Sequence, residues 1–256
     1  MQKIALINQK GGTGKTTSAV NIGAGLSRLG KTVLLIDIDP QAHLSYSLGI
    51  KASLGIKAYQ LERTVYELLR KEATLDQVIV ERTSRLKIIP GSLDLANIEI
   101  EFAGKEGNTF ILKDILQGLR GFEYIIVDCP PALNILTVNA LTYVQKAYIP
   151  LQTEFLALQG MGKLLDTIEA IKKEYNPSLQ IRLLGTRYDQ RKVLNRQIME
   201  KIKGFLGNRV FDTLIRENIS LAEAPSFGLD VFEYKVKSHG SEDYLALCKE
   251  IIKDGE

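Results

Sequence analysis

A cluster of glycine, lysine and threonine residues near the start of the chain has the composition of a phosphate-binding loop. The segment NQKGGTGKTT, residues 8–17, holds three glycines and two lysines. Glycines let backbone N–H groups turn toward phosphate oxygens, a lysine reaches the β- and γ-phosphates, and a hydroxyl binds Mg²⁺. The residues expected to form this cradle are Gly11, Gly12, Thr13, Gly14, Lys15, Thr16 and Thr17. The pattern therefore predicts a site for nucleotide phosphates with Mg²⁺.

Carboxylates at the ends of two apolar runs are expected beside this loop. The run VLLIDID ends with Asp37 and Asp39, and YIIVD ends with Asp128. A carboxylate in such a place holds Mg²⁺, directly or through water, or orients the water that attacks the γ-phosphate. A lone aspartate after a strand is more often a helix cap or a loop residue. Three of them in register with a phosphate loop favour a shared site.

Strand-like apolar runs alternate with helical patterns, and this alternation positions the polar side chains. The expected strands lie at 3–8, 32–39, 86–91, 124–130, 147–152 and 181–189. The expected helices lie near 15–29, 64–71, 111–119, 134–143, 160–174, 192–206 and 241–253, and the least regular stretches near 40–64 and 100–110. The alternation predicts an α/β fold, a doubly wound, mostly parallel sheet flanked by helices, in one domain over residues 1–256. Ligands of such sheets bind at the carboxyl ends of the strands.

The lysine at position 10 departs from the usual phosphate loop. The spacing G-x-x-x-x-G-K-[ST] requires a glycine at position 9, where this chain has Gln9, and the paired glycines follow Lys10. The arrangement KGGTGKT resembles the deviant Walker A loop of the ParA/MinD/nitrogenase-iron-protein group of P-loop ATPases. In that family the early lysine reaches the nucleotide held by the partner subunit. The resemblance implies an ATP-dependent homodimer, in which Lys15 serves its own ATP and Lys10 serves the neighbour's.

The same resemblance assigns roles to the carboxylates. DIDPQ resembles the family's switch I, where Asp39 is linked to hydrolysis, and IIVDCPP resembles Walker B and switch II, with Asp128 in the magnesium shell. The role of Asp37 stays open. The catalytic residues implied are Lys10, Lys15 and Asp39, and the magnesium ligands implied are Thr16, Asp39 and Asp128.

Four branches of this group make different demands on the sequence. An iron–sulfur protein needs interface cysteines, and of Cys129 and Cys248 only the first lies near the site. A MinD-like protein needs a basic amphipathic C-terminal helix, whereas SEDYLALCKEIIKDGE leans acidic and is expected to pack on the core, without stable membrane association. A dethiobiotin-synthetase-like enzyme needs a small-substrate pocket, for which the sequence has no separate signature. The ParA/Soj branch, which segregates DNA, remains.

Basic residues concentrate between positions 182 and 209, where eight Lys or Arg accompany two Asp or Glu. The apolar face expected on a helix from about 192 consists of Leu194, Ile198, Ile202 and Phe205. The cations expected on the opposite face are Lys192, Arg196 and Lys203. Such a stripe binds DNA phosphates without reading bases, although an isolated stripe is more often an ordinary solvated face.

Two further segments carry the resemblance to ParA/Soj. TRYDQR resembles the stretch where a strand ends near the adenine and a following arginine, here Arg191, contributes to non-specific DNA binding. IRENISLAEAPSFG resembles a family pattern whose Arg216 and Asn218 are expected at the nucleotide. The predicted DNA-binding residues are Arg187, Arg191, Lys192, Arg196, Lys203, Lys235 and Lys237.

Overall charge and cysteine content set wider limits. The net charge of +3 permits contact with nucleic acid or anionic lipid without demanding either. Two cysteines without metal-type spacing, and an N-terminus without a leader pattern, favour a reducing cytoplasm. A strand expected from residue 3 leaves no room for the N-terminal helix-turn-helix of many plasmid-borne relatives, so operator recognition is not expected.

The resemblance as a whole implies a weak ATPase that acts as a switch on the nucleoid. The ATP-bound homodimer binds double-stranded DNA of any sequence, and a ParB-like centromere-binding protein stimulates hydrolysis and releases it. Two alternatives stay open. One is a ParA-like protein that positions a protein cargo, and the other is a P-loop metabolic or metallocluster-carrier enzyme that does not bind DNA.

Overall fold

One seven-stranded sheet runs through the protein. The computed structural model describes residues 1–50 and 63–255, without the side chains of 155–159; residues 51–62 of the irregular stretch expected at 40–64 lie outside the described part. The strands are β1 (Gln2–Leu6), β2 (Val33–Asp37), β3 (Val80–Thr83), β4 (Leu86–Ile89), β5 (Tyr124–Asp128), β6 (Lys146–Gln152) and β7 (Gln180–Thr186). Their order is β3-β4-β2-β5-β1-β6-β7. The β3–β4 pair at one edge is antiparallel and the other described pairs are parallel, which confirms the predicted fold class.

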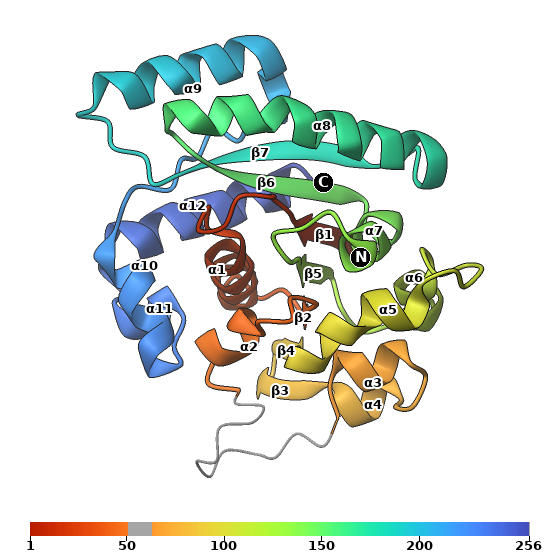
Figure 1. The fold of residues 1–256 in the computed structure, drawn as a ribbon. Helices are drawn as coiled ribbons and strands as arrows, with labels where there is room; N and C mark the ends of the chain where they lie inside the picture. Colours follow the sequence, from red (N-terminus) through yellow and green to blue (C-terminus); the bar gives the residue numbers. More distant parts are fainter. Residues whose placement is uncertain (51–62, 256) are drawn as a thin grey trace.

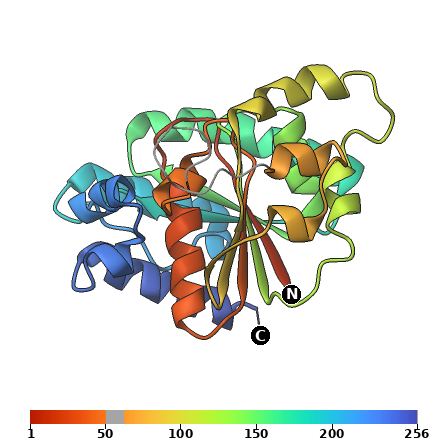
Figure 2. The same cartoon turned by 90° about the horizontal axis from the view of Figure 1, so that it is seen from below.

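Helices cover both faces of this sheet. The long ones are α1 (Lys15–Arg28), α7 (Ile135–Tyr143), α8 (Phe155–Tyr175), α9 (Val193–Leu206) and α12 (His239–Lys253). The short ones are α2 (His43–Ser47), α3 (Val65–Leu69), α4 (Leu75–Val78), α5 (Ile98–Phe102), α6 (Ile111–Ile115), α10 (Ile219–Glu223) and α11 (Val231–Tyr234), with 3₁₀ turns η1 (Leu93–Asn97), η2 (Gly207–Arg209) and η3 (Ala224–Phe227). Helices α1, α2, α11 and α12 pack on one face, and α3 to α9 on the other (Figure 1, Figure 2).

The two faces explain why the strands are apolar without interruption. In β1, Ile4 and Leu6 pack under α1 and α12, whereas Ala5 belongs to the core on the opposite face. Successive side chains of a strand point to opposite faces, so a sheet covered on both faces needs apolar residues at every position. The strand β3 lies at the edge, and only alternate residues of its VERT sequence are half-buried.

The C-terminal helix α12 packs on the core, as its sequence predicts. Its buried face includes Tyr244, Leu247, Cys248 and Ile251, and the Cys248 thiol lies 3.4 Å from the carbonyl oxygen of Ile22 in α1. Among the described helices, none combines the length and the apolar character that crossing a membrane requires.

The apolar face predicted for α9 was wrong at both ends. The buried residues of this helix are Asn195, Ile198, Met199 and Ile202, whereas Leu194 is 50% and Phe205 93% exposed. The helix is rotated relative to the prediction because its first turn buries a polar side chain, Asn195, which hydropathy does not mark as a core residue. Its contacts are described below.

Candidate nucleotide site

The phosphate loop, residues 8–17, follows β1 and leads into α1. Gly12 and Gly14 have φ angles of 72° and 95°, in the left-handed region that favours glycine. The Thr13 hydroxyl donates to the carbonyl oxygen of Lys10 (3.3 Å), and α1 begins at Lys15. The loop thus presents its backbone N–H groups at a helix N-terminus, where the helix dipole favours a phosphate.

Two strand ends hold the loop in this shape. The Gln152 amide at the end of β6 donates to the carbonyl oxygen of Gly12 (2.7 Å). The Thr186 hydroxyl at the end of β7 donates to that of Thr13 (2.9 Å). The carbonyl groups of the loop are therefore held from the side of the sheet, which leaves its N–H groups to face away from these two strand ends.

The two lysines of the loop occupy different surroundings. Lys15 is buried, with its ammonium 3.5 Å from the carbonyl oxygen of Lys10; burial lowers its pKa, and the carboxylates of Asp128 and Asp39 oppose that shift. The Lys10 side chain is half-exposed, and its ammonium lies 3.3 Å from Gln152 Oε1 and 3.5 Å from Glu154 Oε2. Lys15 therefore belongs to its own cradle, whereas Lys10 points toward the surface.

Strand register places two of the predicted aspartates side by side. Asp37 ends β2 and is paired with Asp128, which ends the neighbouring β5, and both are fully buried. Neither oxygen of the Asp128 carboxyl has a hydrogen bond of good geometry in the described part of the chain, although the Thr16 hydroxyl lies near enough to lower the pKa of this carboxyl. Burial and the nearby Asp37 raise the pKa of Asp128 well above its usual value, against the influence of Thr16 and Lys15. A buried carboxyl beside a hydroxyl fits Mg²⁺, which prefers oxygen ligands.

The structure gives Asp37 a role that the sequence left open. Its Oδ2 accepts hydrogen bonds from the Ser45 backbone N–H (2.9 Å) and hydroxyl (2.7 Å), and its Oδ1 accepts one from the Asp39 N–H (3.3 Å). Asp37 therefore anchors the turn that carries Asp39 into α2. Asp39 is itself nearly buried, and its Oδ1 accepts from the Gln41 N–H (2.9 Å).

A cavity of about 490 Å³ opens beside the loop. The predicted residues Gly12, Thr13, Gly14, Thr17, Arg216 and Asn218 all line it. The Arg216 guanidinium is fixed on Asp243 (2.6 and 3.0 Å) and Glu242 (2.9 Å), and the Asn218 side chain caps α10 by accepting from the Ser220 N–H. The structure thus brings the phosphate loop and the segment 216–218 together at one cavity.

Sequence reasoning missed several residues of this cavity. Thr186, Glu217 and Tyr244 line it, and so does Arg187, which the sequence predicted for DNA contact. The signal available was the position of Thr186 and Arg187 at the carboxyl end of an expected strand, where ligands of parallel sheets bind.

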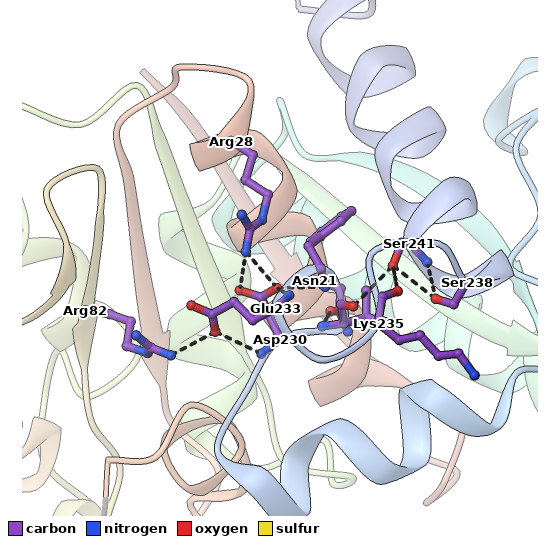
Figure 3. A network of polar contacts seen from close by, with 10 residues as sticks. Asn21, Arg28, Arg82, Asp230, Glu233, Lys235, Ser238 and Ser241 are labelled. Carbon is purple, nitrogen blue, oxygen red and sulfur yellow. Dashed lines mark hydrogen bonds and ion pairs between the residues drawn. The ribbon is translucent and has the colours of Figure 1, made fainter.

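The far end of α1 is held by a network of polar contacts (Figure 3). Arg28 pairs with the buried Asp230 (3.3 Å), and Asn21 accepts a hydrogen bond from the Val231 N–H (2.9 Å). Arg82 of the edge strand β3 pairs with Glu233 (2.8 Å). Helix α1 is therefore fixed at both ends, by the phosphate loop and by α11.

Comparison with known proteins identifies the family of this chain. A family model described as an AAA domain matches residues 1–181. The chain is 40% identical over 257 residues to the chromosome partitioning protein ParA of Caulobacter vibrioides, which covers 98% of this chain and 94% of that protein. It is also 40% identical to the sporulation initiation inhibitor protein Soj of Bacillus subtilis, over 98% of each chain. The chain belongs to the ParA/Soj family.

Solved structures place the ParA/Soj chain among P-loop ATPases. Cobyrinic acid a,c-diamide synthase from Mycobacterium smegmatis, with bound ATP analog and magnesium, is 31% identical with a TM-score of 0.87, over 100% of this chain and 96% of that one. A putative plasmid partition protein of Borrelia burgdorferi bound to AMPPNP is 25% identical with a TM-score of 0.84, over 99% of both. The resemblance inferred from the phosphate loop is confirmed.

Three of the seven residues predicted for DNA contact in this ParA/Soj protein lie in one loop. We call residues 187–192, between β7 and α9, the basic loop. Arg191 is 86% exposed and pairs with Asp189 (2.9 Å), which lowers the pKa of Asp189 to about 2. Arg187 and Lys192 both pair with Glu217, at 3.2 and 3.9 Å. The cations of the basic loop are thus exposed but already paired.

The remaining predicted DNA contacts lie outside this loop. The Arg196 guanidinium donates to the carbonyl oxygen of Gln190 (2.6 Å), whereas Lys203 near the end of α9 pairs with Asp212 (3.1 Å). Lys235 and Lys237 are exposed before α12, and the Lys235 side chain extends away from its neighbours (Figure 3). The structure therefore brings Arg196 to the basic loop and leaves Lys203 at the opposite end of its helix.

Proposed function

We propose that this protein is an ATP-dependent DNA-partitioning ATPase that acts in chromosome or plasmid segregation. One observation carries the proposal: Arg187 of the basic loop lines the cavity beside the phosphate loop, where the nucleotide is expected. The segment expected to contact DNA therefore begins at the site expected to hold ATP. The 40% identity to proteins named for chromosome partitioning, over nearly the whole chain, supports it.

At the site, each part of the chain has a distinct task. The backbone N–H groups of residues 11–16 and the Lys15 ammonium hold the phosphates, and the cavity beside Arg216 and Asn218 takes the base. Thr16, Asp39 and Asp128 would hold Mg²⁺, which neutralises charge on the phosphate oxygens when bound. Asp39 orients the attacking water. Hydrolysis is weak, and a partner stimulates it.

The switch is a homodimer that forms only with ATP. Lys10 leaves Gln152 and Glu154 and completes the nucleotide site of the second copy. Pairing two basic loops doubles the number of phosphate contacts, so DNA of any sequence is bound by the dimer far more tightly than by the monomer. A ParB-like protein stimulates hydrolysis and returns the protein from the nucleoid to the cytoplasm.

A second candidate is a metabolic enzyme without DNA binding. It is favoured by the name of the Mycobacterium smegmatis neighbour, which is 31% identical. A third, a ParA-like protein that positions a protein cargo, uses the same DNA switch with another adaptor.

The test is binding of the purified protein to a fluorescent DNA duplex of arbitrary sequence. It is measured with Mg²⁺ and ATP, ADP or no nucleotide, at two salt concentrations. The proposal predicts binding that requires ATP and weakens steeply with salt. ATP-driven dimerisation without DNA binding in any state would favour the metabolic candidate.

A further inference from the structure

A buried asparagine connects the basic loop to the sheet. Asn195, in the first turn of α9, is 6% exposed. Its Nδ2 donates to the carbonyl oxygen of Thr153, just after β6, and its Oδ1 accepts from the backbone N–H of Asp189 (3.0 Å). One side chain therefore bridges a strand end and the basic loop.

The same strand end holds the phosphate loop. Gln152, the residue before Thr153, is 4% exposed. Its Nε2 donates to the carbonyl oxygen of Gly12 (2.7 Å), and its Oε1 accepts from the Lys10 ammonium (3.3 Å). A movement of Lys10 or Gly12 therefore changes the contacts of Gln152. This residue directly precedes Thr153, whose carbonyl oxygen Asn195 binds.

On its other side, Asn195 is linked to the arginine expected to contact DNA. The Asp189 carboxylate accepts from the Arg191 backbone N–H and Nε on one oxygen (3.0 and 2.9 Å) and from its terminal nitrogen on the other (2.9 Å). Because the backbone of Asp189 is held by Asn195, the placement of Arg191 depends on this amide.

The Thr153 hydroxyl is an unpaired polar group at this junction. It is 1% exposed and has no hydrogen-bond partner in the described part of the chain. Leaving a buried hydroxyl unpaired is unfavourable, so an arrangement that pairs it competes well with the present one.

We propose that Asn195 is a positioning residue that couples the phosphate loop to the basic loop. This inference rests on the proposed function. When Lys10 leaves Gln152 for the nucleotide of the second copy, the end of β6 loses a contact. Asn195 passes the resulting shift to Asp189, which then presents Arg191 to DNA. The coupling requires both hydrogen bonds of the amide.

The test compares two variants of Asn195 with a control on the same helix. Asn195→Ala removes both hydrogen bonds, and Asn195→Asp keeps an acceptor for Asp189 while replacing the donor to Thr153 with an oxygen. Gln197→Ala changes an exposed residue two positions further along α9. DNA affinity is measured with and without a non-hydrolysable ATP analogue, and analogue affinity with and without DNA.

We expect the analogue to raise DNA affinity at least about tenfold in the wild type and in Gln197→Ala, and less than about threefold in both Asn195 variants. By linkage, DNA raises analogue affinity by the same factor in each protein. DNA affinity without analogue stays within about twofold of wild type. The inference is overturned if the analogue raises the DNA affinity of the Asn195 variants by the same factor as that of the wild type. It is also overturned if the variants lose DNA affinity equally with and without the analogue, since that indicates a merely structural role.

A second readout separates this inference from the proposed function. If the wild type binds no DNA with the analogue, the proposed function fails, and hydrogen exchange of residues 187–192 still tests the coupling. An analogue-induced change in exchange that is present in the wild type and absent in both Asn195 variants supports it. The same change in all proteins, or no change in the wild type, overturns it.

Discussion

The carboxyl groups of the nucleotide site lie at the ends of central strands and are buried, whereas the arginines of the basic loop lie at the surface and are paired with acids. Asp128 makes no hydrogen bond of good geometry in the described residues, and Arg191 already makes a bidentate one. The first region is a set of buried carboxyl groups with fixed positions, and the second is a cationic surface whose charges are paired with neighbouring acids. Ligand binding therefore stabilises the first, while the second must exchange partners in order to act.

Removing the lysine of the fixed site has the largest expected effect. Lys15→Ala should weaken ATP binding by about 100-fold or more, because charge-assisted contacts to phosphate are strong. Because the variant no longer binds ATP well, its DNA affinity should be the same with and without ATP. Titration with a fluorescent ATP analogue measures the loss, and Lys163→Ala on the exposed side of α8 is the control.

Asp128→Asn should affect the stability of the protein and its ligand binding differently. Without Mg²⁺, the variant should be at least as stable as the wild type, because a neutral amide replaces a carboxyl whose charged form is disfavoured by burial and by the nearby Asp37. Stabilisation by Mg²⁺ and ATP should be lost. Urea unfolding with chelator, and then with ligands, measures both. A variant that is less stable without ligands would contradict the account of Asp128.

The pH dependence of stability tests the same buried pair. Burial raises the pKa of Asp37 from 3.8 to about 7. Between these values folded Asp37 binds more protons than unfolded Asp37, so without Mg²⁺ its contribution to the free energy of unfolding, taken as the difference between the wild type and Asp37→Asn, should fall as pH rises from about 4 to about 7. Unfolding curves across this range check the sign, and a rise would contradict it.

Two arginines of the basic loop are expected to affect ATP affinity differently. Arg191→Ala should weaken ATP-dependent DNA binding about fivefold and reduce the salt dependence by about one phosphate contact per chain, with ATP affinity unchanged. Arg187→Ala should weaken both ATP and DNA binding, because Arg187 lines the nucleotide cavity. Equal effects of the two variants on ATP affinity would show that the regions are not distinct.

The smallest effect is expected away from both regions. Arg28→Ala removes the ion pair with Asp230 at the far end of α1 and should lower the free energy of unfolding by about 1 kcal/mol. ATP affinity should stay unchanged. Thermal unfolding and the ATP titration measure the two quantities on the same sample.

Sequence patterns predict the fixed site better than the surface region. Residues 8–17 form a local motif, and the neighbouring places of Asp37 and Asp128 follow from parallel strands that end at one edge. Arg216 and Asn218 were expected at the nucleotide only through the resemblance to ParA/Soj, whereas Tyr244 was missed. The bridge between Tyr188 and Arg216 that helps to bring this part of the chain to the cavity is a long-range pairing, which no local pattern encodes.

The misses have physical causes as well. The strand β3 is short and charged at an edge, so it lacks the apolar run by which the central strands are recognised. The face of α9 was misjudged because a buried amide, Asn195, replaces an apolar side chain there. Hydrogen bonding at this position outweighs hydropathy, and only the folded chain supplies the partners.

The most direct test of the account is the composition of the DNA-bound species. Sedimentation of the Asp39→Ala variant, which is expected to bind ATP without hydrolysing it, is measured with ATP, Mg²⁺ and a labelled duplex, beside Lys10→Ala. The account predicts two protein chains in each DNA-bound unit of Asp39→Ala, and a monomer without DNA for Lys10→Ala. A monomer that binds the duplex equally well with and without ATP would contradict it.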